Sequence, residues 1–136
     1  MANDVFVEVG PMSASKDAKK VPKEFAAAAP KLMRAAAVRE VKKAKGFTPD
    51  KKGSPKEGFY IDATLTGVTI DAGAKTVKCE LSGVVATYPK KKMLTSSVSG
   101  SATLKGGTDT RDVEDCIAAV AEAITKDKII PFLKKQ

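Results

Sequence analysis

The chain has 136 residues and a formal net charge of +8, from 24 Lys and Arg against 16 Asp and Glu. It contains no His, so it lacks the commonest general base, the commonest metal ligand and any Ser–His or Cys–His dyad. Apolar residues make up 43% and charged residues 29%, which is typical of one soluble globular domain spanning residues 1–136. We therefore expect a single domain that is not an enzyme and that holds no cofactor or metal.

The first third of the chain predicts one strand and one helix. Residues 5–9 alternate apolar and polar side chains, which is typical of a short strand, and the polar stretch 12–21 predicts a loop. Residues 22–45 place apolar side chains at three- and four-residue steps and end in a basic cluster, which predicts a helix. Because Pro30 lies inside this stretch, we expect a kink there or a helix that begins near Ala29.

The middle of the chain predicts a three-stranded antiparallel meander over residues 59–104. Two turn segments, 71–75 and 89–92, separate the three alternating runs. The alternation changes parity at Gly67, which predicts a β-bulge. One face of the meander is apolar, and the other is rich in Ser and Thr, so only one face should be covered.

The last third predicts a helix that covers the sheet. Its apolar stripe runs from Val113 to Ile124, and the stretch 129–133 is too apolar to be a free tail. Pro131 should break any long helix there. The candidate amino-terminal caps are Asp109, Thr110 and Asp112. The predicted order is β-α-β-β-β-α, an α+β fold whose mostly antiparallel sheet carries two helices packed on one face.

The two cysteines, Cys79 and Cys116, each lie on the apolar stripe of their own predicted element. These stripes should face each other, so a disulfide is geometrically reasonable. It would close a loop of roughly 38 residues and add roughly 4 kcal/mol to the free energy of unfolding. Two buried thiols are the alternative, and the residues alone leave both open. The absence of a CxxC motif and of His argues against a redox or metal role.

Carboxylates are the remaining groups that could do acid–base chemistry, since two suffice for glycoside cleavage. The candidates for such a pair are Asp62, Glu80 and Asp109. Turns, a helix cap and a solvated sheet face account for them as well. A small carboxylate-dependent hydrolase is therefore our third hypothesis, and it requires two of these side chains in one pocket.

Two surfaces are candidates for binding. The Ser/Thr row on the outer side of the last strand would suit a partner protein, through the sheet face or by β-addition at its edge. Its members are Thr95, Ser97, Ser99, Ser101 and Thr103. The lysine clusters would suit a polyanion such as nucleic acid, although Arg is scarce and the outer face is expected to lack stacking aromatics. The candidate polyanion contacts are Lys42, Lys43, Lys45, Lys90, Lys91 and Lys92.

One stretch of the chain resembles the second strand of several small bacterial envelope domains. The stretch is Phe59-Tyr60-Ile61-Asp62-Ala63-Thr64-Leu65-Thr66-Gly67, and a later helix after a Ser/Thr-rich strand fits the same domains. These are the lipoprotein activators of penicillin-binding proteins, the curli-secretion lipoprotein and the amino-terminal domain of the Tol-system propeller protein. The resemblance implies a periplasmic or secreted protein that acts by contact with another envelope protein or with itself. It also favours the disulfide, because the periplasm is oxidising.

The sequence departs from these domains in lacking a lipoprotein cysteine at the amino end, so a lipid anchor is not supported. No signal peptide and no stretch long and apolar enough to span a membrane is expected. A Met placed before a mature exported domain would give the same start, so the missing signal does not prove a cytoplasmic origin. A cytoplasmic protein is the alternative. A non-enzymatic envelope or secreted binding protein is our first hypothesis, and a basic nucleic-acid-associated protein is the second.

Overall fold

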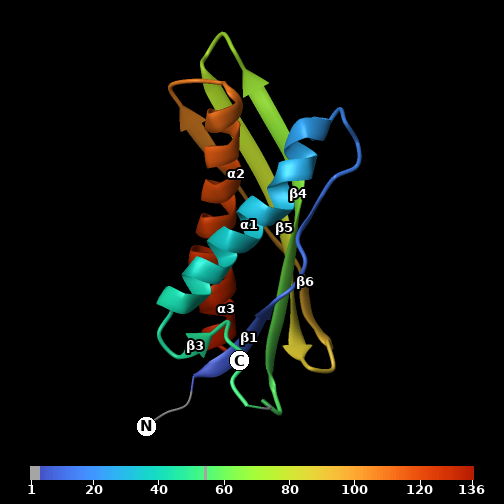
Figure 1. The fold of residues 1–136 in the computed structure, drawn as a ribbon, viewed down its shortest axis with the longest axis vertical. Coiled ribbons are helices and arrows are strands. Elements are labelled where there is room, and N and C mark those ends of the chain that lie inside the picture. The colour runs from blue at the N-terminus through green and yellow to red at the C-terminus, as the bar shows by residue number, and fades with distance from the viewer. Residues whose placement is uncertain (1–3, 54) are drawn as a thin grey trace.

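A computed structural model describes residues 4–53 and 55–136 of the chain. Its elements in chain order are β1 (Val5–Val9), β2 (Ser13–Ala14), α1 (Lys23–Lys43), β3 (Phe47–Thr48), β4 (Gly58–Asp71), β5 (Thr76–Tyr88), β6 (Met93–Lys105), α2 (Thr110–Ile124), a π-helical segment η1 (Thr125–Ile129) and α3 (Ile130–Lys134). Figure 1 shows a long twisted sheet with α1 and α2 against the same side. The predicted α+β class, with two main helices on one face, is confirmed.

The sheet follows the order β3-β1-β4-β5-β6, and β2 pairs with β4 outside this path. The three long strands form the predicted antiparallel meander, while β1 runs parallel to both β3 and β4. The register of β4 against β5 shifts between Leu65 and Gly67, which confirms the predicted bulge. The strands β2 and β3 were not predicted, because two residues are too few to show alternation.

Helix α1 is continuous through Pro30, so the expectation that it begins near Ala29 is wrong. It begins at Lys23 after an N-cap at Pro22. Phe25, at 5% exposure, is buried in the core and holds the turn ahead of the proline on the sheet. This burial offsets the backbone hydrogen bond that a proline inside a helix removes.

The helical path also continues past the point where Pro131 was expected to break it. Helix α2 passes through η1 into α3, and Pro131 lies in the first turn of α3. The expected docking of this segment is confirmed, because Ile129, Ile130 and Leu133 are buried. At its other end α2 begins with a capping box in which Asp109 and Asp112 accept from each other's backbone N–H.

The core lies between the two helices and one face of the sheet. Strand β5 shows the pattern best, with Val77, Cys79, Leu81 and Val85 all within 2% of complete burial. Among the described helices, none is both long and apolar enough to cross a membrane. The helices cover one face only, so the opposite face of the long strands is where a site can be sought.

Candidate binding face of the sheet

The side of the meander that points away from the helices is called the open face here. In the pairing of β5 with β6, Lys78 lies beside Thr103, Glu80 beside Ser101, and Ser82 beside Ser99. Directly paired residues of an antiparallel sheet point to the same side, so hydroxyls and charges share this face. The members of the open face are Asp62, Thr64, Lys78, Glu80, Ser82, Val84, Ser99, Ser101 and Thr103.

The predicted Ser/Thr row is only partly brought together. Ser99, Ser101 and Thr103 are exposed on the open face. Thr95 instead pairs with Val85, whose side chain is fully buried on the helix-covered side. The register shifts on both sides of this pair and so reverses the expected alternation. The side chain of Ser97 lies outside those that the structure describes.

At one end the open face carries an aromatic cluster, defined as Phe6, Tyr60 and Tyr88. The sequence predicted no aromatics on this face that could stack on a base, and it did not predict this cluster. The rings of Phe6 and Tyr88 meet edge to face with centroids 4.8 Å apart. Gly58 pairs with both residues across three neighbouring strands, and a Cβ there would meet the Phe6 backbone. The cluster was missed because its members come from three strands and become neighbours only through the pairing.

Two lysines lie on this cluster. The Nζ of Lys91 is 4.6 Å from the centre of the Tyr60 ring, and the Nζ of Lys51 is 5.8 Å from the centre of the Tyr88 ring. Both distances are within the range of a cation–π contact. A hydrogen bond with the Tyr88 side chain raises the pKa of Lys51, so its positive charge is retained. Lys91 adopts a left-handed backbone with φ of 56°, an uncommon conformation for a residue with a side chain.

Tyr60 is an enclosed member of the cluster, at 9% exposure. Its ring lies against Gly10, where a Cβ would collide with it, and its hydroxyl donates to Asp62 Oδ2 at 3.0 Å. Burial, together with this hydrogen bond, raises the pKa of Tyr60 to about 12. The ring faces are therefore in use inside the protein and are not free to stack on a base.

The predicted lysine contacts fall at two separate edges. Lys42, Lys43 and Lys45 are exposed near the end of α1, which leads into the edge strand β3. The cluster formed by residues 90–92 lies in the turn before β6, the opposite edge strand. The lysines of residues 51–56 lie next to that turn. The reason is that β4, which follows them, begins at Gly58, and Gly58 pairs with Tyr88 at the end of β5.

A shallow hollow of about 380 Å³ lies near the other end of the open face, beside the bulge of β4. Its lining is mostly polar and includes Lys19, Lys20, Thr66, Gly67, Val68, Thr69 and Glu80. Glu80 also forms an ion pair with Lys78, with 3.4 Å between Nζ and Oε1. The hollow offers both signs of charge and an exposed backbone turn, which suits a polar partner surface.

The three carboxylates of the hydrolase hypothesis do not meet in either cavity found among the described residues. Asp62 borders a small apolar cavity of about 10 Å³, Glu80 borders the hollow, and Asp109 caps α2. The described residues also contain no cluster of three or more His, Cys, Asp or Glu that could hold a metal ion. The geometry therefore gives no support to paired-carboxylate chemistry.

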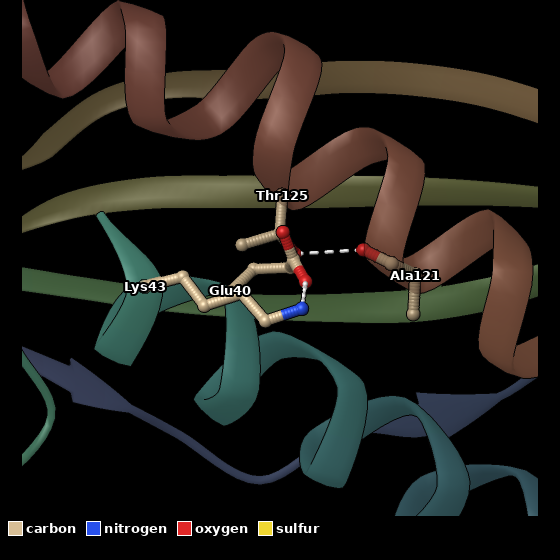
Figure 2. Close-up of polar contacts among 4 residues, drawn as sticks. All are labelled: Glu40, Lys43, Ala121 and Thr125. Atoms are coloured by element: carbon tan, nitrogen blue, oxygen red, sulfur yellow. Dashed lines mark hydrogen bonds and ion pairs between the residues drawn. The ribbon is translucent and has the colours of Figure 1, made fainter.

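Glu40 is a buried acid that sequence reasoning missed. It is 6% exposed on α1, and Figure 2 shows its carboxylate directed at Thr125 on the opposite helix. Its Oε2 has no hydrogen-bond partner and only an ion pair of 3.5 Å with Lys43, because the Thr125 hydroxyl donates to the Ala121 carbonyl instead. The signal was present in the sequence, since Glu40 falls seven residues after Met33 on the apolar stripe.

The cysteines are buried free thiols in this structure. The Sγ of Cys116 donates to the carbonyls of Val77 and Ala102 at 3.4 and 3.5 Å, and Ala102 is the register partner of Cys79. The Cys116 thiol, together with burial, raises the pKa of Cys79. The expected facing of the two side chains is thus present, and their oxidation to a disulfide stays a prediction.

No protein-family model and no curated protein sequence matches the chain. Solved bacterial structures share its fold. A Xanthomonas campestris protein of the DUF330 family is 13% identical with a TM-score of 0.58, over 98% of this chain and 87% of that one. A candidate lipoprotein from Caulobacter crescentus is 13% identical with a TM-score of 0.53, over 95% and 88%. A hypothetical protein from Chlamydia trachomatis is 12% identical with a TM-score of 0.57, over 95% of each chain.

At these identities the likeness shows the fold alone. The fold that these bacterial proteins share with the chain is compatible with the resemblance drawn from residues 59–67. It singles out none of the three families named there.

Proposed function

We propose that this chain is a non-enzymatic envelope or secreted accessory protein that binds a partner protein through the open face of its sheet. One observation carries the proposal: both main helices pack on the same side, and no other described element covers the opposite side. Polar side chains lie there in register across β5 and β6, with Ser82 beside Ser99 and Glu80 beside Ser101. A rigid sheet presents such groups without an ordering penalty on binding.

The chemistry of this face suits a protein partner better than a small ligand. Interfaces between proteins combine a polar rim with a few fixed aromatic or basic side chains, and they need no deep pocket. The open face has the aromatic cluster at one end and the mixed-charge hollow at the other. The fold likeness to a candidate lipoprotein supports an envelope setting for such a partner.

The face is favoured over the edge of β6 as the contact surface. Lys128 donates from Nζ to the backbone carbonyl of Ser99, so a charged side chain occupies part of this edge. The register also shifts on both sides of the pair Val85–Thr95, which makes the first half of β6 irregular. Lysines and bulges are the devices that prevent strands from pairing edge to edge. β-addition at β6 is therefore the weaker form of the binding hypothesis.

Affinity purification from envelope extract of the native host tests the proposal. Ser82→Arg and Ser101→Arg place a bulky charge on the open face, and Ala35→Arg places the same charge on the exposed side of α1 as the matched control. We expect one specific partner with the unmodified protein and with Ala35→Arg, and loss of that partner with either serine variant. Equal recovery with all three variants, or no specific partner at all, would contradict the proposal.

Nucleic-acid association is the second candidate, because the structure does bring lysines and aromatic rings together at one corner. Its weakness is that the Tyr60 ring is enclosed and a lysine already lies on it. It predicts binding to generic duplex DNA that falls steeply with salt. The absence of binding at roughly 50 mM salt would remove it.

A further inference from the structure

The turn between β5 and β6 carries three lysines, and two exposed apolar residues follow it. Lys90, Lys91 and Lys92 are exposed, and Met93 and Leu94 follow them directly at 56% and 36% exposure. Most large apolar side chains of the described chain are buried, and these two stand out as exposed neighbours in sequence. An exposed apolar pair next to a lysine run is a pattern that solubility alone does not explain.

This turn is a fixed shape. The backbone N–H of Lys91 donates to the Thr87 carbonyl at 2.9 Å, and that of Lys92 donates to Thr87 Oγ1 at 2.9 Å. The Thr87 N–H donates back to the Lys92 carbonyl at 2.9 Å. The edge-to-face contact of Phe6 with Tyr88 holds the base of the turn. The lysines and the apolar pair therefore keep their arrangement in the absence of a partner.

A second lysine group lies at the same end of the sheet. Gly58, where β4 begins, is the register partner of Tyr88, where β5 ends, so the segment ahead of β4 adjoins the turn. This segment contributes Lys51, which reaches the Tyr88 ring. We name the combined surface the basic tip, and its members are Lys51, Lys52, Lys56, Lys90, Lys91, Lys92, Met93 and Leu94. Only Asp50 and Glu57 oppose this charge within the two segments.

We propose that the basic tip docks on the surface of an anionic lipid bilayer, with Met93 and Leu94 buried among the headgroups. Charge complementarity supports this partner, because each lysine near an anionic membrane adds a similar increment of attraction. The apolar pair adds the term that electrostatic attraction lacks, since its side chains leave water on insertion. A tyrosine at the base of the turn also suits the interface between lipid and water.

Nucleic acid is a poorer fit for the same surface. Binding to phosphodiesters favours Arg, whose fork matches phosphate geometry, and the three arginines at positions 34, 39 and 111 lie outside the basic tip. Met93 and Leu94 would also stay exposed to water against a phosphate backbone.

The long strands run along the longest axis of the molecule, so docking by this end would direct them away from the bilayer (Figure 1). The open face beyond the aromatic cluster would then stay accessible, so a partner could still bind Ser82 and Ser101.

Co-sedimentation with vesicles tests the inference. We expect the unmodified protein to bind vesicles of phosphatidylglycerol and phosphatidylethanolamine, and not vesicles of phosphatidylcholine. The variant Lys52→Gln/Lys90→Gln/Lys92→Gln spares the lysines that contact the rings, and it should lower the partition coefficient about 100-fold. Met93→Ser/Leu94→Ser should lower it about tenfold while leaving the charge unchanged.

The matched control is Lys16→Gln/Lys19→Gln/Lys20→Gln, which removes the same charge from an exposed segment between β2 and α1. It should bind within about threefold of the unmodified protein, given the short range of electrostatic attraction in salt. An equal loss with both triple variants would reduce the effect to net charge and overturn the inference. A Met93→Ser/Leu94→Ser variant that binds normally would also overturn it, since it would indicate general polyanion binding. Unchanged circular dichroism spectra would show that each variant is folded.

Discussion

The two faces of the long meander are made from alternating residues of the same strands, but the side chains on the two faces differ in chemistry. On the covered face, strand β5 places Val77, Cys79, Leu81 and Val85 against the helices, and all are within 2% of complete burial. On the open face the same strand exposes Lys78 and Glu80 to water, and its last residue, Tyr88, belongs to the aromatic cluster. Burial imposes one chemistry on the covered face, whereas the open face varies along its length.

This difference follows from burial, which constrains the covered face alone. The covered face is uniformly apolar because a buried polar group without a hydrogen bond lowers the stability of the fold. The open face combines hydroxyl rows, a hollow and a rigid aromatic–lysine corner, none of which the core requires. Four experiments test this difference between the two faces.

Oxidation of the cysteine pair should stabilise the covered face most. The Sγ of Cys116 lies against the backbone beside Cys79, so we expect mild oxidation to join the two side chains across α2 and β5. The bond should raise the free energy of unfolding by roughly 4 kcal/mol. Intact mass would report the loss of two hydrogens, and denaturant unfolding would report the stability. If the mass and the unfolding midpoint stay unchanged after treatment with the oxidant, the two cysteines remain buried thiols and the prediction is wrong.

Adjacent substitutions in β5 compare the two faces directly. Leu81→Ala removes a side chain that is 2% exposed on the covered face and should lower the free energy of unfolding by about 3 kcal/mol. Ser82→Ala, one residue later on the open face, should change it by less than about 0.5 kcal/mol. Urea unfolding of both variants gives the two values. Similar losses would mean that the open face is covered in solution.

Glu40 is the exception to the apolar rule on the helix side. Its buried Oε2 lacks a hydrogen bond, and its ion-pair partner Lys43 is 68% exposed. Glu40→Met should therefore raise the free energy of unfolding by about 1 kcal/mol, as removal of other weakly compensated buried charges does. Lys43→Met serves as the control and should not stabilise, because it leaves the acid without its cation. A loss of stability in Glu40→Met would show that the carboxylate contributes more than its ion pair with Lys43.

The titration of Tyr60 tests how enclosed the aromatic corner is. Tyr88→Phe leaves Tyr60 as the sole tyrosine, and its ultraviolet absorbance should titrate with a midpoint of about 12. Because this folded-state pKa is raised from 10.0, the neutral ring contributes stability below pH 10.0 that is lost as the pH rises through about 12. Asp62→Asn should lower the midpoint, since it removes the carboxylate that accepts from the hydroxyl. A midpoint near 10.0 would place the ring in solvent.

Some of the candidate site followed from local pattern. The exposed placement of Ser99, Ser101 and Thr103 was predictable, because alternation holds wherever the register is regular. Thr95 was not, because two shifts in pairing reverse the sides there, and they depend on the neighbouring strand. The aromatic corner depends likewise on the parallel pairing of β1 with β4, which brings Phe6 beside residues far along the chain.

The sequence by itself determined the α+β class, the meander with its two turns and its bulge at Gly67, and the helices that cover one face. These features rest on periodicity and on turn residues within short windows. The tertiary structure alone set the continuation of the helical path past Pro131 and the joining of two lysine segments with aromatic rings at one end of the sheet. The physical reason is that packing between distant segments sets these features, and local propensity yields to it.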